Sequence, residues 1–142
     1  MYELVRAYQA FESYSIPHIR TLGLTSPQFD IIATLGNTEG MTFKELGEKT
    51  LITKGTLTGV VDRLVVKKLV KRVACREDGR RQYVLLTKSG EEMFVRIFPA
   101  HLSYLEQVFG NFSQNDFENT GAVLQQLKDA FLAADANLEE TV

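Results

Sequence analysis

Apolar residues between positions 54 and 67 recur at intervals of three and four. Leu57, Val60, Val61, Leu64 and Val65 follow the spacing i, i+3, i+4, i+7, i+8, which is typical of a helix with one buried face. The spacing predicts a helix over 54–67 with all five residues turned toward a core.

Two shorter helical segments precede this one. Residues 28–35 are apolar on most sides, and Ser26 and Pro27 before them suit an N-cap and a first helical position,. Residues 42–45 read Thr-Phe-Lys-Glu, which is a capping box and predicts a short helix to about residue 49,. Residues 51–53 then form the turn of a helix-turn-helix.

Two segments rich in β-branched residues follow the longer helix. Residues 69–76 and 81–86 flank the dipeptide Asp78-Gly79, which favours a tight turn between antiparallel strands. We expect a β-hairpin here, and a cap from Thr87 or Ser89 for the next helix.

The outer thirds of the chain carry helical patterns of their own. Residues 2–22 form a helix that Pro17 kinks or ends,. Residues 90–132 carry two apolar seams, with Pro99 interrupting the first and Ser113 starting the second. The seam positions are Phe94, Phe98, His101, Leu105 and Val108, then Phe117, Thr120, Leu124, Leu127 and Phe131.

This order of elements is that of a winged helix. We expect a mainly α (α+β) fold and one domain over 1–142. A winged helix-turn-helix lobe with a small β-hairpin wing spans 24–88. The flanking segments 1–23 and 89–136 would be dimerisation helices, because their apolar surface needs a second subunit to cover it.

Charge is unevenly distributed along the chain. The net charge is -2, but residues 42–88 hold 12 Lys and Arg against 5 Asp and Glu, and the remainder carries -9. A basic segment in an acidic chain indicates either nucleic-acid binding or a solvated face. No apolar run suits a membrane span or a signal peptide, and a single cysteine excludes an internal disulfide,. We expect a cytoplasmic protein.

The polar face of the predicted 54–67 helix carries two glycines, Gly55 and Gly59. Glycine within a helix costs about 1 kcal/mol relative to alanine. Either the helix backbone closely approaches DNA bases in a major groove, or the face is a tolerated, weakly stable surface. Thr56 and Thr58 offer hydroxyls and methyls to bases, and Lys54 and Arg63 offer charge to phosphates.

The predicted hairpin is strongly basic. Arg80 next to its turn suits a minor groove, where the potential is most negative; the alternative is a solvated basic hairpin. Asp78 would fix the turn. The residues expected to bind DNA are Thr42, Lys44, Thr53, Lys54, Gly55, Thr56, Thr58, Gly59, Arg63, Arg76, Asp78, Arg80 and Arg81.

Several strings in 24–90 resemble the MarR family of transcription regulators. They are Leu24-Thr25-Ser26-Pro27-Gln28-Phe29, Phe43-Lys44-Glu45-Leu46, Val60-Val61-Asp62-Arg63-Leu64, Leu69-Val70-Lys71-Arg72, Asp78-x-Arg80 and Val84-x-Leu86-Thr87-x-x-Gly90. The resemblance implies a homodimer on a pseudo-palindromic operator of double-stranded DNA, usually as a repressor. It also implies a small-molecule effector site between the DNA lobe and the dimer helices.

Two positions depart from the family pattern. Lys68 stands where such sequences usually have glycine, and Cys75 lies in the first wing strand rather than near the first helix, where the peroxide-sensing branch has its cysteine. We therefore interpret Cys75 as a plain strand residue. If Lys68 occupies the left-handed position that glycine usually fills, its backbone is strained by about 1 kcal/mol.

The remaining candidate chemistry is sparse. Tyr8, Phe11, Tyr14 and His18 either line a pocket for a small aromatic or phenolic effector or pack in the core or dimer interface. His101 suits a hydrogen-bonded structural residue, and two histidines with one cysteine are a poor metal set,. No catalytic or cofactor motif is present. An enzyme is thereby disfavoured, and a dimeric interaction module without sequence-specific DNA binding is the main alternative.

Overall fold

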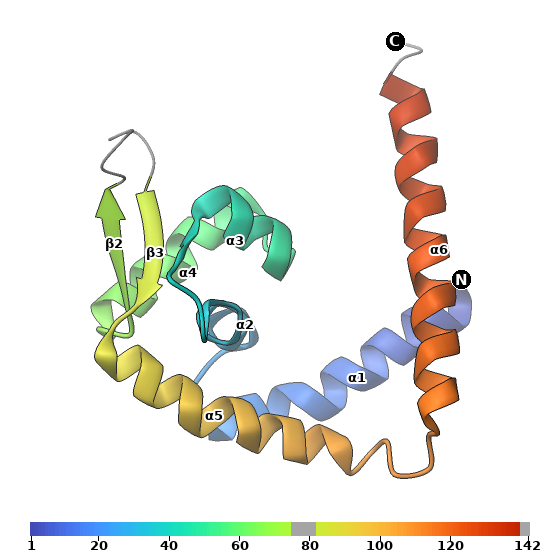
Figure 1. Cartoon of the computed structure of the whole chain (residues 1–142), viewed down its shortest axis with the longest axis horizontal. Helices are drawn as coiled ribbons and strands as arrows, with labels where there is room; N and C mark the ends of the chain where they lie inside the picture. Colours follow the sequence, from blue (N-terminus) through green and yellow to red (C-terminus); the bar gives the residue numbers. More distant parts are fainter. Residues whose placement is uncertain (75–81, 140–142) are drawn as a thin grey trace. The chain divides into compact units, whose positions relative to one another are not determined.

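The structure, a computed structural model, describes residues 1–74 and 82–139 (Figure 1). It divides into two compact units, 1–105 and 106–142. The described residues form six helices and a small antiparallel sheet, so the predicted winged-helix order is confirmed. The elements are α1 (Tyr2–Thr21), α2 (Ser26–Leu35), β1 (Met41–Thr42), α3 (Phe43–Thr50), α4 (Lys54–Val66), β2 (Val70–Ala74), β3 (Gln82–Leu86), α5 (Lys88–Glu106) and α6 (Gln114–Glu139).

The sheet has the strand order β1-β3-β2. β2 and β3 pair antiparallel from Val70 opposite Leu86 to Ala74 opposite Gln82, which confirms two hairpin strands. β1 was not predicted, because a strand of two residues is too short to show an alternating pattern,. It pairs Met41 with Val84 and so holds the start of α3 beside the wing strands.

α4 packs its apolar stripe into the core of the first unit. Leu57, Val60, Val61 and Leu64 are buried against a cluster that includes residues of α2. The expectation for Val65 was wrong, since its side chain is 38% exposed. At about 100° per residue, Val65 lies about 80° around the helix from Leu57 and so leaves the buried face.

The helix starts agree with the sequence at all but one position. Thr42 and Glu45 form the predicted capping box of α3. The N-cap of α2 is Thr25 rather than Ser26, which is already helical, and the Thr25 amide donates to the Gln28 side chain at 3.2 Å. Thr87 accepts from the amide of Gly90 at 3.1 Å at the start of α5.

Neither helical proline ends its helix. α1 continues past Pro17 to Thr21, and α5 continues past Pro99 to Glu106. Proline removes one amide donor from a helix. The second residue after each proline is buried, Ile19 in α1 and His101 in α5, and this tertiary packing supports the helix across the missing bond.

The predicted seam of α5 belongs in part to the chain's own core. Phe94, Ile97 and His101 are buried within the first unit, whereas Val108 lies beyond the helix and is exposed. The ring of Phe94 lies 2.2 Å from the place where a Cβ on Gly36 would sit. Only glycine at the end of α2 permits this contact. Phe94 therefore packs within the core of its own subunit and is not available for a dimer interface.

Candidate nucleic-acid interface

The outward face of α4 is open to solvent. The helix contacts α2, α3 and β2 through its buried side (Figure 1), and the residues opposite that side are exposed or half-exposed. The structure therefore brings six of the predicted DNA-binding residues together on one face: Lys54, Gly55, Thr56, Thr58, Gly59 and Arg63.

The two glycines of this face have no reason for being glycine within the chain. A Cβ added at Gly55 would meet nothing within 4 Å, and one at Gly59 would meet only the Arg63 guanidinium, at 3.8 Å. Both sites thus accept a side chain in ordinary van der Waals contact or in open space. The surface is smooth along this line of α4, which leaves the backbone accessible to an outside partner.

The threonines of this region are exposed, and their hydroxyls already form hydrogen bonds within the chain. Thr53 donates its hydroxyl hydrogen to Thr56 Oγ1 at 3.2 Å, and the Thr58 hydroxyl donates to the carbonyl of Lys54 at 3.4 Å. These bonds use the hydroxyl hydrogens of Thr53 and Thr58, while each hydroxyl oxygen keeps acceptor lone pairs for another partner.

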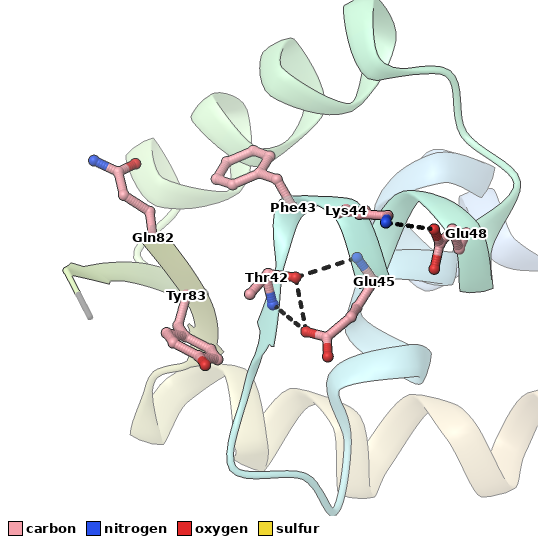
Figure 2. A pocket seen from close by; sticks show the side chains of 7 residues that line it. All are labelled: Thr42, Phe43, Lys44, Glu45, Glu48, Gln82 and Tyr83. Carbon is pink, nitrogen blue, oxygen red and sulfur yellow. Dashed lines mark hydrogen bonds and ion pairs between the residues drawn. The ribbon is translucent and has the colours of Figure 1, made fainter. Parts of the chain in front are cut away.

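Thr42 and Lys44 lie at a shallow depression of about 630 Å³ between the start of α3 and β3 (Figure 2). The Thr42 hydroxyl donates to a Glu45 carboxylate oxygen at 2.7 Å and accepts from the Glu45 amide at 3.3 Å. A DNA contact from Thr42 would have to compete with this cap. The Lys44 ammonium is 4.0 Å from Glu48 and is 86% exposed, so its charge stays available,.

Sequence reasoning missed one connection across this face. The Arg72 guanidinium on β2 donates to the Asp62 carboxylate of α4 and lies 5.1 Å from the centre of the Phe43 ring on α3. One side chain therefore joins α3, α4 and β2. No sequence signal marks such a pairing, because Asp62 and Arg72 are ten residues apart on different elements.

Basic residues continue beyond α4, with different roles. Lys67 donates to the carbonyl of Gly23 and to the side chain of Gln28, both at 3.3 Å, and so ties the end of α4 to the start of α2. Lys68 has a φ of 58°, so it does occupy the left-handed position that glycine usually fills in the family. Arg76, Asp78, Arg80, Arg81 and Cys75 lie outside the described residues, and their expected roles stay predictions.

A second candidate site lies in the first unit, among α1, α2 and α5. It is a cavity of about 260 Å³, and Tyr8 and Phe11 are among its lining residues. Tyr14 and His18 are not among its lining residues. Its other walls are formed by Glu12, Ser15, Ile16, Ile19, Ser26, Phe29, Asp30, Phe98, His101, Leu102 and Leu105.

Tyr14 and His18 belong instead to an aromatic stack beside the cavity. The Tyr14 ring stacks on Tyr104 with centroids 4.5 Å apart, and His18 stacks on the same ring at 4.1 Å. The His18 and His101 Nδ1 atoms are 2.9 Å apart, and His101 Nε2 is 3.1 Å from the Ser15 hydroxyl. His101 is therefore the hydrogen-bonded structural residue that the sequence predicted.

Burial perturbs two titratable groups of the cavity wall. It raises the pKa of Asp30 to about 6. Burial, with the neighbouring His18, lowers the pKa of His101. Both pKa values move in this way because burial disfavours the charged form of each group, the carboxylate of Asp30 and the imidazolium of His101. Within the part of the chain that the structure describes, no three His, Cys, Asp or Glu side chains are grouped to hold a metal, and no helix is long and apolar enough to cross a bilayer.

The architecture and the exposed face of α4 define a winged helix-turn-helix protein. A sequence profile of the MarR family matches residues 22–81. The regulator SarZ of Staphylococcus haemolyticus is 32% identical over 104 residues, covering 72% of this chain and 68% of SarZ. The homoprotocatechuate degradative operon repressor of Escherichia coli is 27% identical, and the match covers 98% of this chain and 91% of the repressor. The chain belongs to the MarR family of DNA-binding transcriptional regulators.

Solved structures show the same fold. AbsC, a MarR family regulator from Streptomyces coelicolor, has a TM-score of 0.84 at 21% identity, covering 92% of this chain and 90% of AbsC. NadR in complex with 4-hydroxyphenylacetate has a TM-score of 0.76 at 24% identity, covering 88% and 89%. The MepR–DNA complex of S. aureus has a TM-score of 0.79 at 18% identity, covering 91% and 96%.

Proposed function

We propose that this protein is a sequence-specific repressor that binds a pseudo-palindromic operator of double-stranded DNA as a homodimer. The main support for this proposal is the exposed face of α4. Gly55 and Gly59 leave the helix backbone uncovered there, although a side chain at either position would not clash with the rest of the chain. A helix presented in this way suits the major groove, which is about 12 Å wide. The solved MepR–DNA complex, with the same fold, supports DNA as the partner.

A second copy of the chain is the proposed cover for the outer helices. In the second unit, α6 exposes large apolar side chains, including Phe117, Leu124 and Phe131, which are 44%, 44% and 55% exposed. They lie on the predicted seam with 3-4 spacing. Apolar side chains repeated along one helix face are typical of a protein interface. A C2 dimer would present two recognition helices to successive major grooves, about 34 Å apart.

Repression and its release rest on the relatives. The Escherichia coli relative is named as a repressor of a homoprotocatechuate degradative operon, and NadR was solved with 4-hydroxyphenylacetate. We propose that a small aromatic effector occupies the cavity among α1, α2 and α5 and releases DNA. The relatives are transcriptional regulators, which favours a regulator over an enzyme. A DNA partner also favours the cytoplasm as its location.

Gly59→Ala tests the proposed groove contact. A Cβ at position 59 has room within the chain, so alanine should stabilise α4 by up to about 1 kcal/mol. The same Cβ would stand between the helix and the bases, so affinity for the operator should fall tenfold or more, by about 1.4 kcal/mol or above. Thermal unfolding and fluorescence anisotropy, with an operator selected from random duplexes, measure the two effects.

Gly59→Ala is expected to raise stability but to lower operator affinity. A misfolded variant would lose both, so it cannot be mistaken for the expected result. Anisotropy on a scrambled duplex is the control, because its binding depends on phosphates and should change little. If Gly59→Ala binds the operator as tightly as the wild type, α4 does not enter the groove along this line. Equal affinity of the wild type for both duplexes would favour the alternative, a dimeric interaction module without sequence-specific DNA binding.

A further inference from the structure

The cavity among α1, α2 and α5 has an unusual charge composition for a site that accepts a small aromatic molecule. Five aromatic rings line it, those of Tyr8, Phe11, Phe29, Phe98 and His101. Two carboxylates, Glu12 and Asp30, share the wall, and none of its lining residues is Lys or Arg. At about 260 Å³ it lies at the small end of ligand pockets, and so suits a single ring,.

Asp30 is the carboxylate that lacks a partner. Glu12 accepts a hydrogen bond from the Tyr8 hydroxyl at 3.0 Å. No hydrogen bond or ion pair joins Asp30 to another of the described residues, and burial alone raises its pKa to about 6. At pH 7.5 the group is therefore ionised while it is partly removed from water and has no counter-ion.

Among the described residues that line the cavity, none is a Lys or Arg that could compensate Asp30. The cavity wall that Asp30 shares includes Tyr8, Glu12 and Ser15 of α1 and His101 of α5, whose pKa burial lowers. Lys49 of α3 lines an adjoining depression that Asp30 also reaches, but the two side chains form no ion pair. A ligand in the cavity is thus the available source of positive charge.

We propose that the effector cavity selects a single-ring aromatic ligand that carries a protonated amine and discriminates against an aromatic carboxylate, with Asp30 as the residue that sets this preference. The inference rests on the proposed effector role of the cavity. An ammonium within reach of Asp30 forms an ion pair at the edge of the apolar wall, where the attraction is screened less than at an open surface. The aromatic rings favour a cation as well. A carboxylate in the same place would meet Asp30 with like charge and no donor of opposite charge.

Three probes of nearly one shape test the sign of the charge. Tyramine carries an ammonium, tyrosol a neutral hydroxyl and 4-hydroxyphenylacetate a carboxylate at the end of the same hydroxyphenyl chain. Calorimetry on the protein without DNA should rank them in that order. We expect tyramine to bind about tenfold or more tightly than 4-hydroxyphenylacetate, which corresponds to about 1.4 kcal/mol.

Two variants assign the ranking to one residue. Asp30→Asn keeps the shape of the side chain and removes its charge, so the difference between tyramine and 4-hydroxyphenylacetate should fall to about threefold or less. Lys49→Gln is the matched control, changing a charge outside the cavity wall, and should preserve the ranking. A far-UV circular dichroism spectrum that matches the wild type shows that Asp30→Asn is folded.

Lowering the pH provides an independent readout. Protonation of Asp30 removes the charge that attracts tyramine, so the wild-type affinity for tyramine should fall about tenfold from pH 7.5 to pH 5. Every other titratable group of the protein is unchanged in Asp30→Asn. Any fall in tyramine affinity that remains in this variant therefore comes from groups other than Asp30 and is subtracted.

The outcomes separate this inference from the proposed function. If 4-hydroxyphenylacetate binds as tightly as tyramine, if Asp30→Asn keeps the ranking, or if no probe binds, the charge preference is wrong. Tyramine binding that leaves the DNA complex intact overturns the effector role while the charge preference stands. The expected ranking in a protein that binds no operator would likewise overturn the proposed function alone.

Discussion

Replacing Lys68 with glycine should stabilise the protein. Lys68 follows the end of α4 with φ of 58°, and it occupies the C′ position of a Schellman motif. Its amide donates to the carbonyl of Val65 at 2.9 Å, and the amide of Leu69 donates to that of Leu64 at 3.0 Å. This motif requires a left-handed residue and usually uses glycine. Lysine with its Cβ is strained there by about 1–2 kcal/mol.

The net gain is smaller than the strain. Glycine makes the unfolded chain more flexible, which offsets about 0.4–1 kcal/mol. We therefore expect Lys68→Gly to raise the free energy of unfolding by about 0.5–1 kcal/mol. For a chain of this size the midpoint should rise by about 2–4 °C. Circular dichroism at one fixed protein concentration measures it, because a dimer's midpoint depends on concentration.

Lys68→Ala is the matched control. Alanine removes the same charged chain but keeps the Cβ, so its stability should equal that of the wild type. If Lys68→Gly is no more stable than Lys68→Ala, the left-handed strain is not the cause and the reasoning fails. DNA binding separates the charge from the backbone, since a phosphate contact by the Lys68 ammonium would be lost equally in both variants.

Three further predictions concern the wing, the dimer and the cavity. Arg80→Ala should cost about 1–3 kcal/mol per subunit on the operator and relax preference at the flanking positions. Lys44→Ala should weaken specific and scrambled duplexes alike and reduce the salt slope by about one. Equal losses for both variants on both duplexes would make the wing a mere electrostatic anchor. Light scattering at micromolar concentration should show a dimer, and Phe131→Asp should yield a folded monomer; a wild-type monomer would contradict the dimer proposal. Asp30→Asn should stabilise the protein at pH 7.5 by about 1 kcal/mol after discounting for solvent screening. The raised pKa means that ionisation of Asp30 opposes folding, so this gain should shrink as the pH falls from about 6 toward 4. A gain independent of pH would assign it to packing.

Local features of this fold were predictable from the sequence. The α4 stripe depends on the helical period, and the Thr42–Glu45 capping box depends on two residues three positions apart,. The departure from glycine at Lys68 pointed to a left-handed position as the condition for strain there, because the family pattern usually has glycine at that position. Each of these predictions uses information within one or two helical turns, where geometry follows directly from spacing.

Features that join distant segments were not predictable in the same way. Arg72 finds Asp62 only once β2 lies beside α4, and Tyr14 meets Tyr104 across 90 residues of chain. Tyr8, Phe11, Tyr14 and His18 recur along α1 at helical spacing, yet in the structure Tyr8 and Phe11 line the cavity, whereas Tyr14 and His18 stack on Tyr104. This difference depends on where α5 packs against α1, and local spacing in the sequence does not give that position.

The contact between the two histidines restricts how many protons this part of the molecule can hold. His18 and His101 face each other through their Nδ1 atoms at 2.9 Å. One ring must therefore carry the Nδ1 hydrogen and the other must present a lone pair. The pair is stable with no net charge or with a single positive charge, but a second proton would set two N–H groups against each other. The tautomer of His101 also decides whether its Nε2 atom donates to the Ser15 hydroxyl or accepts from it. A hydrogen-bonding group at Ser15 is thereby linked, through alternating donors and acceptors, to the protonation pattern of His18 on the other side of His101.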